Sequence, residues 1–334
     1  MTGRALIACL LTVMSGPAMA PAETALQANN DILFQQLQAA HHLSDAQLDR
    51  IKQIFAQSSR IGQGNPAVTR HPMTPEQCAA HIPGGPASYS NPQFERICGG
   101  KYLAPLYDPA TQRPEDAKVC IDQFEYPNIP CTYPVVWVKA DEAAQICAAM
   151  GERICDAHEW EGACAGQLLP PDYRFDLARG VSEDVAVQRM RAAHNAKYAA
   201  TKSWSYGPAY KTGVCAADSS KSPGCPGGSF TQCGSNTYPS GSFPDCKSSL
   251  GVYDINGNAA EHMNLPLSPD EMSSGNGPEL GVTEMKGSWF IFDKYRAHPD
   301  WCRWRAPFWH GTDVMSPNSH ANYHLGFRCC KTLN

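Results

Sequence analysis

The stretch from residue 251 to residue 262 reads GVYDINGNAAEH and gathers side chains that could surround a hard cation. Asp254, Asn256, Asn258 and Glu261 supply carboxylate and amide oxygens, and the Asn-Gly pair favours a sharp turn that aims backbone carbonyls inward. Calcium takes six to eight oxygens of this mixed kind. The alternative is a plain type I′ turn with charged neighbours, because such turns favour Asn-Gly as well. We expect a structural calcium site here.

Cys302 is the best single candidate for a catalytic residue. Arg303 and Arg305 flank it in the stretch CRWR, and nearby cations lower the pKa of a thiol and favour the nucleophilic thiolate. The competing interpretation is a structural disulfide, which would leave Cys302 without a reactive thiol. The sequence leaves both open.

Aromatic and cationic residues are concentrated around this cysteine. Four of the seven tryptophans lie between residues 289 and 309, with arginines interleaved. Aromatic faces beside guanidinium groups suit a peptide, an aromatic ring or an anionic ligand. Packing in the protein core explains the tryptophans equally well. The residues expected to bind substrate are Trp301, Arg303, Trp304 and Arg305.

Histidines in the C-terminal part raise the question of an iron site. His298, His310, His320 and His324 occur there, the last two in the stretch HANYH. Two histidines four residues apart can bind a metal when they share a helix face. The surrounding asparagines and the strand-like LGFRCC that follows indicate a loop instead. Iron is therefore an alternative to histidines that only form hydrogen bonds.

Local patterns predict the elements that must position these residues. Two helices are expected between residues 24 and 58, the second capped by Ser44 and Gln47 in a capping box. The stretches KVCIDQFEYPN and YPVVWV are typical of strands. Two further helices follow, one from Asp141 to a stop at Gly151 and one from the cap at Asp156 to a stop at Gly166.

Composition bounds the class of protein. The first 22 residues have the layout of a secretory signal peptide, with one arginine, a ten-residue apolar run and small residues. Its removal changes the formal net charge from -5 to -6, which argues against a nucleic-acid partner. Nothing after it is long and apolar enough to span a membrane. The sequence leaves the oligomeric state open.

The number of cysteines also indicates an exported protein. Of fifteen cysteines, Cys9 leaves with the signal peptide and fourteen remain. An even, high count in an exported chain is typical of a disulfide framework, which places the mature protein in the periplasm or outside the cell.

Four segments in order resemble the sulfatase-modifying factor family, which includes the formylglycine-generating enzymes. They are CIDQFEYPN, YPVVWVKADEAAQICAAMGERICDAHEWEGAC, PSGSFPDCKSSLGVYDINGNAAEHMN and KGSWF with CRWR and HLGFRCC. The resemblance covers roughly residues 95 to 334. It implies an α+β fold with sparse regular secondary structure, related to C-type lectins and here stapled by disulfides.

The resemblance also implies particular ligands and bridges. The calcium ligands would be the side chains of Asp254 and Glu261 and the carbonyls of Gly257 and Ala259. One disulfide would join Cys164 to Cys329, and the resemblance suggests another between Cys147 and Cys155.

The catalytic pattern of the enzymes is incomplete in this chain. Formylglycine-generating enzymes hold copper(I) with two cysteines five residues apart, because soft thiolates suit that ion. If Cys302 is the second, Ala297 stands at the first position. Ala260 stands where those enzymes have a tryptophan, and His324 where they have an asparagine. Both departures add to the disagreement with a copper-thiolate mechanism.

We therefore expect a signal peptide (1–22), a helical N-terminal extension (23–60), a loop-rich linker (61–94) and one sulfatase-modifying-factor-type domain (95–334). Two functions are compatible with this domain organisation. One is a metal-dependent oxidase or oxygenase acting on a peptide or small molecule, with copper or iron as cofactor. The other is a non-catalytic module that binds a ligand or a protein on the same fold.

Overall fold

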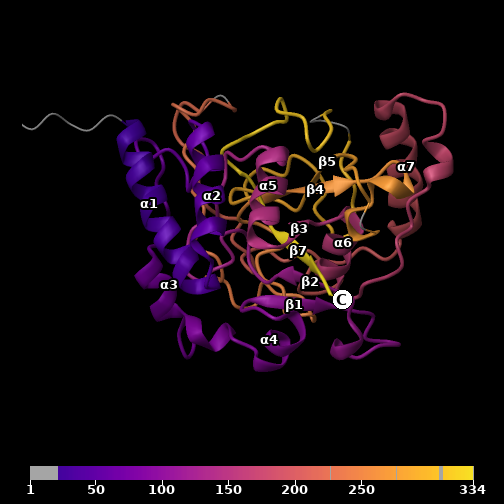
Figure 1. The fold of residues 1–334 in the computed structure, drawn as a ribbon, viewed down its shortest axis with the longest axis horizontal. Helices are drawn as coiled ribbons and strands as arrows, with labels where there is room; N and C mark the ends of the chain where they lie inside the picture. Colours follow the sequence, from indigo (N-terminus) through magenta and orange to yellow (C-terminus); the bar gives the residue numbers. More distant parts are fainter. Residues whose placement is uncertain (1–21, 226, 276, 308–310, 334) are drawn as a thin grey trace, which may run out of the picture.

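The computed structural model describes residues 22–225, 227–275, 277–307 and 311–333. The expected signal peptide lies outside the described residues except for its last position. Helices α1 (Ala22–His41) and α2 (Asp45–Gln57) come first and form one side of the molecule (Figure 1). The capping box of α2 is confirmed, because the Ser44 side chain accepts from the Gln47 N–H and the Gln47 side chain accepts from the Ser44 N–H.

Five further helices are distributed along the described chain: α3 (Pro75–His81), α4 (Pro92–Cys98), α5 (Ala140–Met150), α6 (Ala157–Ala165) and α7 (Glu183–Tyr198). The expected helices around residues 141–150 and 157–165 are α5 and α6. Gly151 and Gly166 end them in the left-handed conformation, as the sequence predicts. Short 3₁₀ turns lie at Pro86–Tyr89, Pro114–Asp116, Phe175–Leu177, Pro269–Glu271 and Ser273–Gly275.

Within the described residues, seven short strands form two sheets. The first is antiparallel throughout, in the order β1-β2-β7-β3, and contains β1 (Leu103–Leu106), β2 (Val119–Asp122), β7 (Cys329–Thr332) and β3 (Arg153–Ile154). The second has the order β5-β4-β6 and contains β5 (Val282–Lys286), β4 (Ala260–Leu265) and β6 (Leu325–Phe327). Strand β4 is antiparallel to β5 and parallel to β6. The mixed fold with modest regular secondary structure confirms the expected class.

Arg328 is the single residue between β6 and β7, so the chain passes there from one sheet to the other. The guanidinium is fully buried. A charge buried at such a crossing needs a partner, which the functional site supplies.

The expected strand YPVVWV is wrong. Residues 133–138 form only one isolated bridge, between Val136 and Gly62. Trp137 has a positive φ of 58°, which interrupts an extended ladder. β-branched and aromatic composition here reflects burial rather than strand pairing, because Val135, Val136 and Val138 are fully buried.

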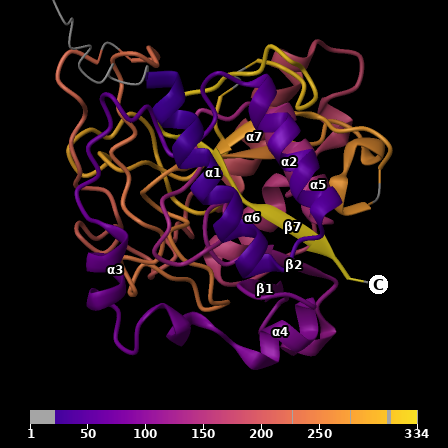
Figure 2. The ribbon, with the colours of Figure 1, turned by 60° about the vertical axis from the view of Figure 1, so that its left-hand side comes forward.

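The N-terminal helices share the core of the domain. Phe34 and Phe55 pack edge to face at 5.1 Å and belong to one cluster with Ile146 of α5 and Phe327 of β6. Figure 2 shows α1 and α2 on the side that the rotation brings forward. Within the described residues, no helix combines the length and apolar content that crossing a bilayer requires.

Candidate functional site

The loop before β4 is sharply curled. Asp254, Gly257 and Asn258 all have positive φ values, of 51°, 87° and 51°. At Gly257 a side chain would also collide with backbone, because a Cβ there would lie 2.9 Å from the Ala216 carbonyl oxygen. The Asn-Gly sequence therefore makes the tight loop that was expected.

A carboxylate holds this loop from within. Glu125 accepts hydrogen bonds from the Ala259 N–H at 2.7 Å, the Asn258 side-chain amide at 2.7 Å and the Ser240 hydroxyl at 3.0 Å. Burial raises the pKa of Glu125 well above its usual range, and the Asp254 carboxyl adds to the rise. The loop thus directs N–H groups at a buried carboxyl group that the sequence did not single out.

Glu261 is already neutralised by a cation of the chain. Its oxygens accept from Arg328 Nε and Nη2 at 2.7–3.0 Å and from the Trp160 indole at 2.8 Å. The Arg328 guanidinium also donates to the carbonyls of Asp122 and Tyr253. Both carboxylate oxygens of Glu261 are committed to this internal ion pair.

Asp254 is different, because it keeps a free acceptor. One oxygen accepts from the Gly241 N–H, while Oδ1 is buried without a hydrogen-bond partner among the described residues. Burial raises the pKa of Asp254 to about 7, and Glu261 adds to this. The residues therefore fit a calcium ion only in part: the Asp254 side chain can contribute an oxygen, and that of Glu261 cannot without breaking its pair with Arg328.

Cys302 has no free thiol. It forms a disulfide with Cys164, with an S–S distance of 2.02 Å, and both residues are fully buried. Since the thiolate is the nucleophile and the copper(I) ligand, this arrangement does not fit the copper-thiolate mechanism.

All fourteen cysteines within the described residues are paired, in seven bridges: Cys78–Cys131, Cys98–Cys120, Cys147–Cys329, Cys155–Cys330, Cys164–Cys302, Cys215–Cys246 and Cys225–Cys233. The disulfide framework is confirmed.

Two expected pairings are wrong. Cys164 pairs with Cys302 instead of Cys329, and Cys147 pairs with Cys329 instead of Cys155. The reason lies in strand geometry. Cys329 and Cys330 are neighbours on β7, and successive side chains of a strand point to opposite faces. One cysteine therefore reaches Cys147 on α5, while the other reaches Cys155 just after β3.

The two arginines expected to bind substrate point into the protein. Arg305 is fully buried and donates to Glu161 at 2.9 and 3.3 Å and to Asp172 at 3.3 Å. Arg303 donates to the Gln167 carbonyl at 2.7 Å, and its guanidinium lies 5.1 Å from the Tyr198 ring. Both guanidinium groups therefore serve the internal structure.

Arg305 belongs to a buried charge network that the sequence did not reveal. Glu161 of α6 accepts from Arg305 and from Lys286 at 2.9 Å, and lies 3.4 Å from His194 of α7. Burial acts to raise the pKa of Glu161, but Arg305, His194 and Lys286 outweigh it and hold that pKa well below its usual range. Helix α6 is buried on nearly all sides, so the charge of Glu161 needs partners inside the protein, and these come from residues far away in the sequence.

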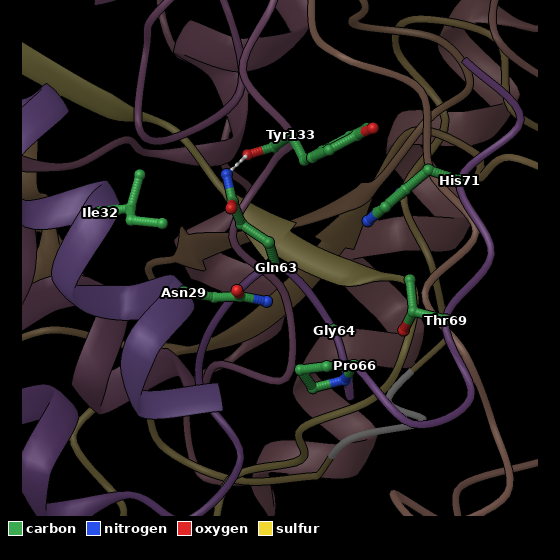
Figure 3. Close-up of a pocket in the computed structure, with 8 residues that line it drawn as sticks. All are labelled: Asn29, Ile32, Gln63, Gly64, Pro66, Thr69, His71 and Tyr133. Carbon is green, nitrogen blue, oxygen red and sulfur yellow. Dashed lines mark hydrogen bonds between the residues drawn. The ribbon is translucent and has the colours of Figure 1, made fainter. Parts of the chain in front are cut away.

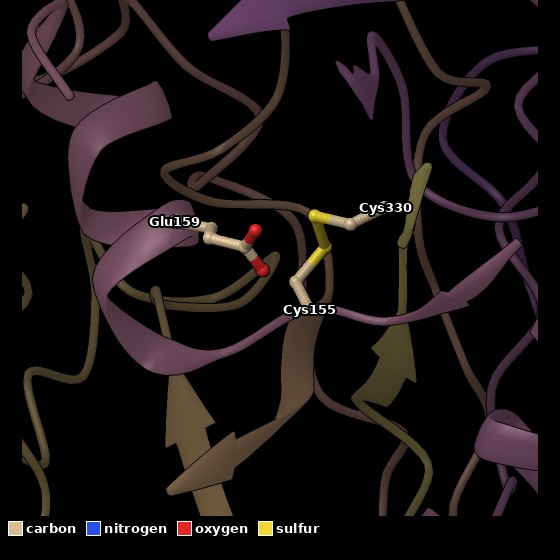
Figure 4. A group of neighbouring side chains, drawn as sticks. All are labelled: Cys155, Glu159 and Cys330. Atoms are coloured by element: carbon tan, nitrogen blue, oxygen red, sulfur yellow. A yellow bond between two sulfur atoms is a disulfide. The ribbon is translucent and has the colours of Figure 1, made fainter. Parts of the chain in front are cut away.

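Three groups of metal-ligand type occur within the described residues, and none is a free site. Glu161, Asp172 and His194 approach one another, but Arg305 and Lys286 already supply the positive charge. Figure 4 shows the second group, in which Cys155 and Cys330 are joined as a disulfide beside Glu159. In the third, Asp122 and Glu152 lie near Cys329, whose sulfur is also in a disulfide.

Five rings gather beside the segment that carries Cys302, and we call them the ring cluster: Trp289, Phe292, His298, Trp304 and His324. His324 stacks on Trp289 at 4.6 Å, and His298 stacks on Trp304 at 5.0 Å with the planes within 4°. Trp289 also contacts His298 at 5.2 Å. The loop conformation of residues 320–324 is as expected, and His310 lies outside the described residues.

An aromatic and cationic surface adjoins the ring cluster. Trp204 packs with the buried Trp301 and Trp304 and contacts Tyr210 at 5.8 Å. The Arg296 guanidinium lies 4.0 Å from the centre of the Tyr210 ring. Arg296 is exposed, as is the neighbouring Tyr295. These exposed groups, rather than Arg303 and Arg305, are available to a ligand.

A search of curated proteins found no match. Among solved structures, the chain is similar to a Major Tropism Determinant I1 variant, with 10% identity and a TM-score of 0.26 over 70% of this chain and 46% of that chain. It is also similar to CarF, with 15% identity and a TM-score of 0.30 over 70% of this chain and 96% of that chain.

The family comparison covers most of the described chain. The family model described as the sulfatase-modifying factor enzyme 1-like domain matches residues 88–333. This range contains all four of the ordered segments on which the resemblance rests. The chain therefore belongs to the sulfatase-modifying factor enzyme 1-like family.

Proposed function

We propose that this chain is an extracytoplasmic, ligand-binding member of its family that does not use cysteine-bound copper. The observation that carries the proposal is the disulfide between Cys164 and Cys302. With every other described cysteine also paired, no thiolate remains to hold copper(I). The competing function is the metal-dependent oxidase or oxygenase, which rests on family membership.

The ligand would be a peptide or small molecule that carries an aromatic ring and negative charge. Tyr210, Tyr295 and Arg296 offer exposed or half-exposed rings and a guanidinium next to the ring cluster. Lys202 adds a cation 5.8 Å from the Trp301 ring. A cation beside an aromatic face favours planar and anionic groups together. Asp293 accepts from the Tyr210 hydroxyl and so fixes the position of that ring.

Redox chemistry supports the proposed compartment. Disulfides persist in oxidising compartments and are rare in the cytoplasm, so seven bridges support the periplasm or the extracellular space. The expected signal peptide would deliver the chain there.

Calcium remains part of the proposal, with a changed ligand set. The Asp254 side chain would be its main protein ligand, with the carbonyls of Gly257 and Ala259. The unpartnered Asp254 Oδ1 supports this, and the Glu261–Arg328 pair argues for leaving Glu261 out of the set. A bound calcium would have a structural role in holding the loop.

Metal content is the measurement that separates these functions. Protein oxidised in a bacterial periplasm should contain calcium and, after anaerobic loading with copper(I) or iron(II) and desalting, less than about 0.1 equivalent of either metal. Asp254→Asn should lose the calcium, whereas Asp245→Asn, at an exposed position of the preceding loop, should keep it. Near-stoichiometric copper or iron would contradict the non-catalytic binding function. An unchanged calcium content in Asp254→Asn would show that Asp254 is not a calcium ligand.

Ligand binding should be tested on an array of acidic peptides that contain tyrosine or tryptophan. Binding should survive treatment with chelators of redox metals, and Arg296→Ala should weaken it about tenfold. Arg189→Ala removes an exposed arginine of α7 and serves as the matched control. Oxidation of a bound peptide by metal-loaded protein would favour the enzyme instead.

A further inference from the structure

A pocket lies at the seam between the N-terminal helices and the domain, and none of the ring-cluster residues lines it. It has a volume of about 310 Å³ and is lined by Asn29 and Ile32 of α1, by the segment 63–71 and by Tyr133. Figure 3 shows these side chains arranged around a shared space. The volume is at the lower end of that of small-molecule sites.

Hydrogen bonds fix the walls of this seam pocket. His71 stacks on Tyr133, with ring centres 3.5 Å apart and planes within 12°. His71 Nδ1 lies 2.8 Å from the Thr237 carbonyl, and the Tyr133 hydroxyl donates to the Met73 carbonyl at 2.8 Å. The Gln63 amide nitrogen donates to the Tyr133 carbonyl at 2.8 Å. The pocket is therefore formed before any ligand arrives.

The lining carries no charge. None of its residues is an acid, a lysine or an arginine. Burial lowers the pKa of His71 to about 4, so the imidazole is neutral at ordinary pH. An anionic or cationic ligand would lose its hydration here without gaining a partner of opposite charge.

Uncharged polar groups nevertheless line the space. The Gln63 side-chain oxygen is left to accept, since its nitrogen is used by Tyr133. Thr69 Oγ1 accepts from the Ser235 N–H, which leaves the hydroxyl hydrogen to donate. A purely apolar ligand would bury these groups without partners and is disfavoured.

An unsatisfied hydroxyl lies under the floor. Ser235 Oγ is fully buried and has no hydrogen-bond partner among the described residues. Gly64 separates it from the space: a Cβ at Gly64 would lie 3.0 Å from Ser235 Oγ and 2.6 Å from Thr69 Oγ1. Gly64, with φ near +100°, thus lacks a side chain that would collide with both hydroxyl groups, and it leaves the Thr69 hydroxyl at the pocket open to a ligand.

We propose that the seam pocket binds an uncharged saccharide unit of hexose size. Such a ring presents hydroxyl groups to the amides of Asn29 and Gln63 and to Thr69. Its apolar C–H face matches Ile32, which is 56% exposed at the rim, and Pro66. This combination of neutral amide and hydroxyl partners with an apolar wall is the chemistry that recognises a neutral sugar.

Ligand-observed NMR with free sugars tests this site. The neutral probes are glucose, galactose, mannose and N-acetylglucosamine, and the charged probes are glucuronate and N-acetylneuraminate. At least one neutral sugar should bind with a Kd in the millimolar range. Ile32→Trp, which fills the rim, should weaken binding at least about tenfold, while Gln35→Trp places the same side chain at an exposed position of α1 outside the pocket and should not.

The same sugar-binding measurement on a variant of the surface beside the ring cluster distinguishes the two sites. Arg296→Ala should leave sugar binding unchanged, and loss of sugar binding in that variant would move the sugar to the other surface and overturn the assignment. Absence of binding by every neutral sugar at about 20 mM, or tighter binding of glucuronate than of glucose, would also overturn it. Melting temperatures of the variants show whether each one is folded.

Discussion

Glu284 and Lys286 lie two residues apart on β5, and both side chains are buried. Burial raises the pKa of Glu284 to about 7, and Lys286 and the Ala306 N–H only partly offset this. The folded state therefore holds the Glu284 proton more tightly than the unfolded chain, whose pKa is near 4.5. As the pH rises from about 4.5 to about 7, this residue lowers the free energy of unfolding, and above 7 the cost is constant.

Glu284→Gln should remove that pH dependence while keeping an oxygen that accepts from the Ala306 N–H. Relative to the wild type, the variant should gain up to about 3 kcal/mol in free energy of unfolding between pH 5 and pH 8. Chemical denaturation at the two pH values measures the difference. Glu279→Gln, at an exposed position, is the control and should change little. An equal effect of Glu284→Gln at both pH values would show that Glu284 ionises normally.

Single residues of the site could be predicted only where the signal was local. The curled loop from Asp254 to Glu261 follows from Asn-Gly and its oxygen-bearing neighbours. Its partners Glu125 and Arg328 could not be found this way, because they lie more than sixty residues away and meet the loop only in the folded sheets. The inward direction of Arg305 depends likewise on Glu161, 144 residues distant.

At the scale of elements, helix ends were predictable and strands only in part: KVCIDQFEYPN contains β2 and LGFRCC contains β6, whereas YPVVWV forms no strand. The caps at Ser44, Gly151 and Gly166 are properties of a few adjacent residues. A strand exists only through its partner, so YPVVWV could satisfy every local preference and still form a single bridge. The N-terminal helices likewise depend on distant partners, because their apolar residues pack against residues of α5 and β6.

Phe55→Ala tests whether α1 and α2 are integral to the domain. Phe55 is 4% exposed and packs on Phe34, so the truncation should cost about 3–5 kcal/mol in the free energy of unfolding of the whole chain. Gln53→Ala on the exposed face of α2 is the control. Hydrogen exchange supplies the decisive reading: lost protection confined to residues 22–58, with the domain unchanged, would mean that the helices unfold on their own.

The whole molecule is held by bridges that span much of its length. Cys164 and Cys302 close a separation of 138 residues, while Cys225 and Cys233 close one of 8. Closing a longer loop removes more entropy from the unfolded chain. Irregular segments between short strands can therefore keep one arrangement with little regular secondary structure.

Removing the two bridges should show this difference. In the loop-entropy model, the double variant Cys164→Ala with Cys302→Ala should lose about 5 kcal/mol, and Cys225→Ala with Cys233→Ala about 2.5 kcal/mol. Denaturant titration under oxidising conditions compares them. The first variant should still bind the acidic aromatic peptides, since no ligand contact is assigned to Cys302. If the variant remains folded but no longer binds these peptides, Cys302 or its disulfide contributes to the ligand-binding site.

The adjacent cysteines at positions 329 and 330 also have a consequence for biosynthesis. Their partners Cys147 and Cys155 emerge 182 and 175 residues earlier, and each waits as a free thiol close to the other in sequence. Oxidation in order of synthesis would join Cys147 to Cys155, a bridge absent from the native fold. Reaching the native pattern then requires thiol–disulfide exchange after residues 329 and 330 have been made. A chain oxidised in that order would depend on an isomerase that reshuffles bridges, because an oxidant alone would leave the Cys147–Cys155 bridge in place.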